Sequence, residues 1–241
     1  MSTIVLNELI TRFHDIGFSV VACVHDCGGS NLSLWKKIGI SYSAERTVMK
    51  HPVTSKNIYF FRDARHLLKL IRNWILEKGF FYKDRLVTKK FLLQLVEKAS
   101  TLKSPYSNTS PEFKNQEHNS LFKLSIKHAT VSGAERQNVR LAAELLSHTT
   151  AVNLRRHFGE YEEAQLLAEI IDKVNSWFDV LNSHQINQSI SSKKCYRMDI
   201  ERQDKILDDM ADLMKNIRTL SNHKLPAPHI YRCFKKQFWF R

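Results

Sequence analysis

The chain has 241 residues, enough for one large domain or two small ones. A hydrophobic content of 43% with 10% aromatic residues supports a folded core and excludes a mainly disordered chain. Lysine and arginine number 37 against 24 acidic residues, and the net charge of +13 favours a polyanionic partner such as nucleic acid. The four scattered cysteines exclude a disulfide scaffold and indicate a reducing compartment. Because the sequence has no membrane-length apolar stretch and no signal-peptide pattern, we expect neither a membrane span nor secretion.

Helix and strand signals alternate in the first hundred residues. Apolar residues at helical spacing predict a first helix that Gly17 ends, and the run Phe18–Val24 predicts one buried strand. The strand stops at a glycine-rich turn, after which Ser30 or Asn31 can cap a short helix.

The alternation continues with a second short strand predicted at Ile58–Phe61. Asp63 can cap a long helix that Gly79 ends. We therefore predict that residues 1–100 form an α/β domain.

The strand signal disappears from Thr88 onward. Residues 101–118 are rich in Ser, Pro, Asn and Lys, which predicts a linker or a long surface loop. Helical spacing predicts three long helices, over 132–159, 162–181 and 200–217. We therefore expect residues 119–222 to be all-helical, followed by a C-terminal tail of different character at 223–241.

Asp26 is the strongest candidate for a functional residue in the first half of the chain. A carboxylate at the C-terminal end of a strand lies where open α/β sheets bind ligands and metals. A Mg²⁺ site for phosphoryl chemistry would need two or three such carboxylates, so the alternative is that Asp26 only caps its turn. Asp63 and His66 allow the same two interpretations, with helix capping favoured for Asp63. Cys23 and Cys27 lack a second ligand pair at zinc-finger spacing.

Phe178, Asp179 and Asn182 form the most suggestive cluster of the second half. Asp179 and Asn182 are three residues apart and therefore share a helix face. A carboxylate can accept hydrogen bonds from N1 and N2 of guanine, an aromatic ring can stack on the base, and a lysine such as Lys123 can hold phosphates. The alternative is an ordinary helix in which Trp177 and Phe178 are core and Asp179 is solvated. The sequence has no phosphate-loop motif and no nucleophile elbow.

Several stretches, taken in chain order, carry a resemblance to a known family. They are Asp26–Ile40, His51–Pro52, Asp63–Asn73, Leu121–Leu124, Val139–Ser147 and Trp177–Ser183. This order resembles P element-type DNA transposases, the family that includes the THAP-domain transposases, over roughly residues 5–222.

The resemblance implies a fold and a set of site residues. Residues 1–100 would be part of an RNase H-like catalytic domain, and residues 119–222 would be a helical insertion domain that binds GTP. Asp26 matches the second residue of the acidic triad of that family, which binds Mg²⁺. In the nucleotide site, Phe178 would pack on guanine and Asp179 would read the base edge. The nucleotide-contacting residues implied by the resemblance are Lys123, Val139, Phe178, Asp179 and Asn182.

The chain also departs from the family pattern. Asn138 stands where a second lysine is expected, and the sequence diverges after about Asn222. The THAP domain, a dimerisation segment and the first catalytic Asp would precede Met1, and the final acidic residue would follow the insertion. We therefore expect a truncated nuclear transposase that binds GTP but lacks the full metal site for DNA cleavage and strand transfer.

The resemblance also implies partners. These are transposon-end DNA and other transposase subunits, with no membrane. One alternative is a domesticated or repressor-like protein that binds DNA or transposase subunits without catalysis. The other is a structural remnant without activity.

Overall fold

The computed structural model describes residues 2–40, 47–103, 121, 123–183, 185–219 and 222–226. The described residues divide into two compact units, one up to Leu67 and the other from Leu68 onward. Most of the predicted linker at 101–118 and of the predicted tail at 223–241 lies outside the described residues. Of the helices described, none is both long and apolar enough to cross a membrane.

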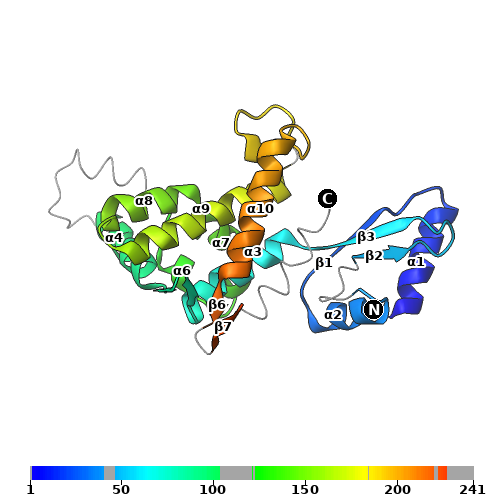
Figure 1. Cartoon of the computed structure of the whole chain (residues 1–241), viewed down its shortest axis with the longest axis horizontal. Helices are drawn as coiled ribbons and strands as arrows, with labels where there is room; N and C mark the ends of the chain where they lie inside the picture. Colours follow the sequence, from blue (N-terminus) through cyan, green and yellow to red (C-terminus); the bar gives the residue numbers. More distant parts are fainter. Residues whose placement is uncertain are drawn as a thin grey trace. The chain divides into compact units, whose positions relative to one another are not determined.

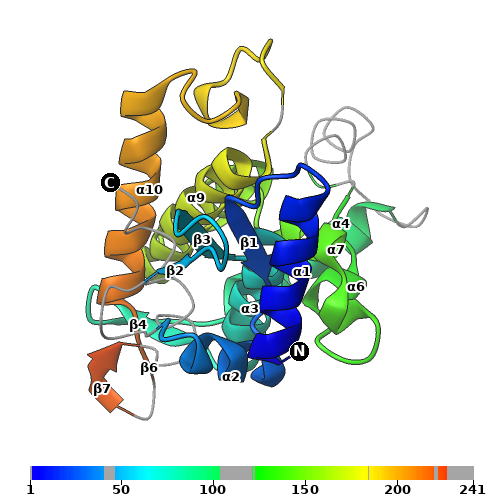
Figure 2. The same ribbon diagram turned by 90° about the vertical axis from the view of Figure 1, so that its right-hand side faces the viewer.

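The first unit is a small sheet with helices on it. Its strands have the order β1-β3-β2, with β1 parallel to β3 and β2 antiparallel to it. Figure 2 shows α1 alongside β1. Its elements are α1 Thr3–Asp15, β1 Ala22–His25, α2 Gly29–Lys37, β2 Val48–Lys50, β3 Asn57–Arg62 and the first turn of α3 Ala64–Glu77 (Figure 1).

Helix α1 begins at a capping serine, ends at a glycine and buries one apolar face. The side chain of Ser2 caps the helix by accepting a hydrogen bond from the N–H of Val5 at 3.3 Å. Gly17 ends it with a φ of 89°, a left-handed conformation that glycine adopts without strain, as predicted. The buried face of α1 joins α2 and β3 in one core made of Leu6, Ile10, Leu34, Trp35, Ile40, Ile58 and Phe60.

Two sequence predictions for this unit were wrong. Strand β1 is not buried on both sides, because it is an edge strand and the helices cover one face, leaving Val24 66% exposed. The short helix begins earlier than predicted, with Gly28 as its N-cap. Asn31 does not cap it, because its amide is bound to the carboxylate of Asp26. The strand at Asn57–Arg62 and the helix after Asp63 were predicted correctly.

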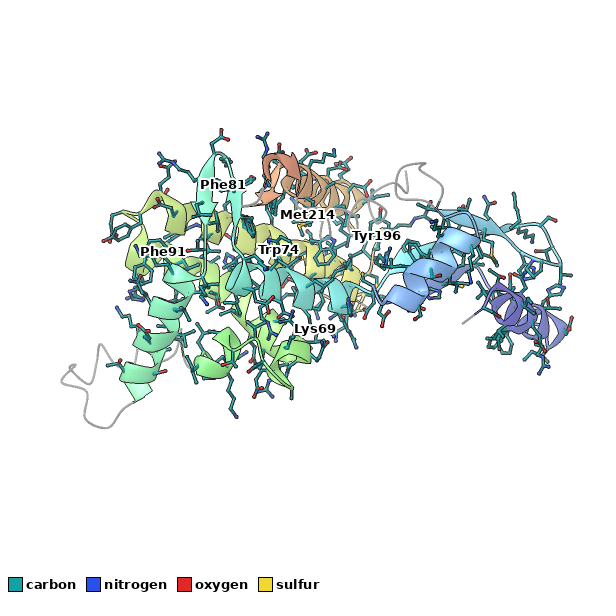
Figure 3. The ribbon with its side chains drawn as sticks, turned by 90° about the horizontal axis from the view of Figure 1, so that it is seen from below. Lys69, Trp74, Phe81, Phe91, Tyr196 and Met214 are labelled. Atoms are coloured by element: carbon teal, nitrogen blue, oxygen red, sulfur yellow. The ribbon has the colours of Figure 1, made fainter. Side chains whose placement is uncertain are left out.

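The second unit is mainly helical around α9. Helices α8 and α10 both pack against α9, and Arg155 of α8 forms an ion pair with Asp172 of α9 at 2.6 Å. Figure 3 labels Trp74, Phe91 and Met214, which come from α3, α4 and α10 of this unit. Besides the rest of α3, its helices are α4 Lys90–Lys103, α6 Ile126–Ala129, α7 Val139–Leu145, α8 His148–Phe158, α9 Glu162–Asn182, α10 Ile200–Asn216 and the 3₁₀ turns η1 Glu135–Gln137 and η2 Ser191–Lys193.

The second unit also holds an antiparallel sheet with the order β5-β4-β6-β7. Its strands β4 and β5 lie within the predicted α/β part, but β6 and the start of β7 fall within 119–222, so the prediction that 119–222 is all-helical was wrong at its end. A hairpin turn with positive φ at Lys83 and Asp84 joins two short strands, and Phe81 pairs with Arg218 from the far end of the unit. Strands this short leave little periodicity to detect. The strands are β4 Phe80–Tyr82, β5 Arg85–Val87, β6 Arg218–Thr219 and β7 Asn222–Pro226.

The helix predicted over 132–159 is broken twice. Asn138 caps α7 by accepting a hydrogen bond from the N–H of Leu141 at 3.1 Å, and Ser147 caps α8 through the N–H of Thr150 at 3.3 Å. Both residues are good N-caps, but the continuous apolar spacing concealed the breaks. The helices α9 and α10 match their predictions closely.

Candidate functional site

The first candidate site lies where β1 and β3 end. Oδ1 of Asp26 accepts hydrogen bonds from the N–H of Gly28 at 2.8 Å and from the amide of Asn31 at 2.7 Å. These two bonds hold the pKa of the exposed Asp26 carboxyl below its usual range. The Asn31 side chain also bonds the ring of His25, whose pKa is lowered chiefly by burial. Asp26 therefore stays ionised and oriented, as a cap of its own turn.

Asp63 follows β3 at the same edge of the sheet where Asp26 follows β1, because the two strands are parallel and paired up to His25 and Arg62. Its N–H donates to the carbonyl of His25 at 2.8 Å, which extends the ladder by one residue. Its carboxylate accepts from the N–H of Arg65 at 3.0 Å, so the predicted capping role is confirmed.

The metal expected at Asp26 does not fit the residues present. Among the residues that the structure describes, no three His, Cys, Asp or Glu side chains gather closely enough to hold a metal ion. Both local donors of Asp26 bind its Oδ1, and the Asp63 carboxylate caps a helix. The described residues around Asp26 therefore do not form a metal site by themselves.

The second candidate site lies at the C-terminal end of α9. Asp179 is half-buried, and burial raises the pKa of its carboxyl. Asn175 donates to its Oδ2 at 3.1 Å from one turn earlier, and the hydroxyl of Ser192 also hydrogen-bonds it. The positive charge of Lys193 acts on the same carboxylate. A carboxylate acceptor is thus held in a partly dry position where the charge of a lysine acts on it.

Ser192 and Lys193 are site residues that sequence reasoning missed. They lie on η2, in the segment 191–195 that packs on the end of α9. The only sequence signal was a serine followed by two lysines, which is too common to be informative. The contact comes from the fold, because the segment returns to a helix that it left several residues earlier.

A buried glutamine of α10 holds the segment 191–195 in place. Gln203 has no exposed surface, and its amide nitrogen donates to the carbonyls of Ser191, Lys194 and Cys195 at 3.1–3.2 Å. Its amide oxygen accepts from the N–H of Arg197 at 2.9 Å. Tyr196, labelled in Figure 3, donates to Asp204 of α10 at 2.6 Å, just beyond the segment.

The other predicted nucleotide residues have these surroundings. Phe178 is half-buried with its ring tilted against Trp177 at a centroid distance of 6.4 Å, and Asn182 is exposed at the end of α9. Lys123 is exposed in the turn before α6, and Val139 is the first residue of α7. The structure brings Asp179 together with Ser192 and Lys193, while convergence of Lys123 and Val139 on Asp179 stays a prediction.

The substitution noted at Asn138 has a local explanation. Its side chain is engaged with the backbone of α7, where it satisfies an N–H that no residue inside the helix can bond. Lys69 and Glu77 of α3 hold the preceding turn through Gln137, at 3.1 Å, and Arg136. Figure 3 labels Lys69 on α3. Position 138 thus serves helix capping here.

Comparison with known proteins gives two clear similarities. The chain is 32% identical over 215 residues to the "Transposable element P transposase" of Drosophila melanogaster, covering 87% of this chain and 26% of that protein. Its fold matches the solved "Drosophila P element transposase strand transfer complex" with a TM-score of 0.81 and 30% identity, covering 99% of this chain and 51% of that one. No protein-family model matches the chain.

These similarities extend over nearly the whole chain, in sequence and in fold together. They are those of a DNA transposase with mixed helical and sheet structure. The chain belongs to the P element-type transposases. It spans about a quarter of the length of its curated relative.

Proposed function

We propose that this chain forms the guanine-nucleotide-binding part of a P element-type transposase. The observation that carries the proposal is the carboxylate of Asp179, which is half-buried, oriented by Asn175 and Ser192, and adjacent to Phe178 on the same helix. A carboxylate can accept about four hydrogen bonds, so the two donors from Asn175 and Ser192 leave it acceptor positions for a ligand. The N1–H and N2–H groups of guanine are partners of the required chemistry.

The other residues of the proposed site would recognise the rest of the nucleotide. Phe178 would stack on the base, and Lys123 would contact the phosphates, where its charge is independent of base identity. Asn182 and Val139 would supply a polar and a backbone or packing contact. GTP would act as a bound cofactor that is not consumed.

We further propose that this chain takes part in DNA transposition in the nucleus with transposon-end DNA and other transposase subunits. Support comes from its net charge of +13 and from its similarity to a protein solved as a strand transfer complex. Cleavage would need carboxylates beyond Asp26, so the chain alone should not nick DNA with Mg²⁺. Nicking by the purified chain that disappears in Asp26→Ala would overturn this proposal.

Thermal unfolding with nucleotides tests the binding proposal. GTP should raise the melting temperature of the purified chain, because a ligand of the native state adds RT ln(1 + [L]/Kd) to its stability. ATP should raise it much less, because adenine N1 is an acceptor and C2 carries no amine. Equal shifts with ATP and GTP, or none with either, would overturn the proposal.

A further inference from the structure

Lys193 lies on a segment that the fold holds against the end of α9 that carries Asp179. The segment 191–195 that carries it is fixed from two sides, because Gln203 bonds three of its carbonyls and Ser183 Oγ donates to the carbonyl of Lys194 at 2.6 Å. The N–H of Cys195 also donates to the carbonyl of Gln185 at 2.9 Å. The backbone of this segment is therefore held firmly against the end of α9.

Two neighbouring side chains of this segment differ in their exposure to solvent. Ser192 is 7% exposed and bonds Asp179, whereas Lys193 is exposed and its positive charge acts on the same carboxylate. The long, flexible side chain of an exposed lysine on this segment can reach a ligand that contacts Asp179. Ser192 thereby orients the carboxylate, and Lys193 supplies a cation whose field reaches it.

Guanine presents a matching pair of groups on its edge. Its N1–H and N2–H donors face a carboxylate, and the neighbouring O6 is an acceptor that suits a lysine. Adenine presents an amino group in place of O6, so a lysine there would face a donor. A carboxylate with an ammonium within reach of the same ligand would therefore match guanine at both ends of this edge.

We propose that Lys193 is a specificity-determining residue of the nucleotide site, donating a hydrogen bond to O6 of guanine while Asp179 accepts from N1 and N2. The proposal rests on the guanine-binding function proposed above. Ser192 and Gln203 are positioning residues in this arrangement, since they orient the carboxylate and hold the segment 191–195.

Calorimetric titration with GTP and 6-thio-GTP tests the contact at O6. The two ligands share the N1 and N2 donors, but sulfur is a weaker hydrogen-bond acceptor than oxygen. The unmodified chain should prefer GTP, and Lys193→Ala should weaken GTP binding about tenfold, as expected for a charged hydrogen bond. The same variant should bind GTP and 6-thio-GTP equally.

Lys194→Ala is the matched control, because it removes the same charge one residue along while the held carbonyl of Lys194 is retained. It should keep both the GTP affinity and the preference over 6-thio-GTP. If GTP binding depends on Asp179 but is unchanged in Lys193→Ala, the role of Lys193 is overturned while the proposed guanine-binding function stands. Absence of GTP binding by the unmodified chain would overturn the proposed function and this inference with it.

Discussion

The side-chain amide of Asn175 donates a hydrogen bond to the carboxylate of Asp179 at 3.1 Å, one turn later on α9. The carbonyl oxygen of the same amide accepts from the main-chain N–H of His148 at 3.3 Å, which fixes the direction in which the amide faces. Asp179 is therefore oriented by the protein before any ligand arrives. Such preorganisation lowers the cost of binding.

On acidification, GTP affinity should fall at a higher pH than it would if Asp179 had the pKa of an ordinary aspartate. Burial raises the pKa of Asp179, and protonation removes the acceptor that guanine N1–H and N2–H require. Affinity is then complete above the raised pKa and lost as the pH falls through it. Asn175→Asp should move the midpoint of a pH titration of GTP affinity upward, because a second carboxylate opposes ionisation of Asp179.

The control for this titration is Gln165→Glu, which adds the same charge near the other end of α9 and should leave the midpoint unchanged. An unchanged midpoint in Asn175→Asp would contradict the assignment.

The folding stability of the nucleotide-free protein depends on the protonation of Asp179 in the opposite direction to GTP affinity. Stability gained from protonated Asp179 is present below its unfolded pKa and is lost as the pH rises through its folded pKa.

Gln203→Leu should destabilise the second unit by about 2–4 kcal/mol, because four main-chain groups of the neighbouring segment lose their partner. Urea unfolding followed by circular dichroism measures this. Lys205→Leu on the same helix breaks only the exposed pair with Asp209 and should cost at most about 0.5 kcal/mol. Similar losses in the two variants would show that Gln203 does not hold the segment.

The helices with strong apolar periodicity and clear ends could be predicted from sequence. Gly17 and Asp63 carry signals that act within a few residues, and both behave as predicted. Strands β4 to β7 were missed because Phe81 pairs with Arg218, a contact that depends on tertiary structure rather than local sequence.

The candidate sites were predictable to different degrees. Asp26 could be placed at the end of a strand, but its bonds to Gly28 and Asn31 required the actual turn. Asp179 could be singled out with Phe178 and Asn182 from the residues alone, but an ordinary helix remained the alternative, and the family resemblance favoured the nucleotide site. Its neighbours Ser192 and Lys193 come from a segment whose return to α9 leaves no pattern in the sequence.

Gly28→Ala should raise the pKa of Asp26 toward its ordinary value. A Cβ at position 28 would lie 2.9 Å from Oδ1 of Asp26, so the carboxylate must move away from the N–H that most lowers its pKa. Gly29→Ala is the matched control, since its Cβ would meet no atom within 4 Å. Carboxyl-carbon NMR titration distinguishes the two variants, and an equal Asp26 pKa in both would refute the role of the Gly28 N–H.

Asp179→Asn offers the most direct measurement of the central claim, that this residue reads the guanine edge. Calorimetric affinities for GTP and xanthosine triphosphate should exchange order, because the new amide can donate to the 2-oxo group of xanthine but loses the ionised acceptor for guanine N1–H and N2–H. Phe178→Ala should weaken both nucleotides equally, since stacking does not depend on the base edge. A variant Asp179→Asn that still prefers GTP as strongly as the unmodified chain would contradict the claim.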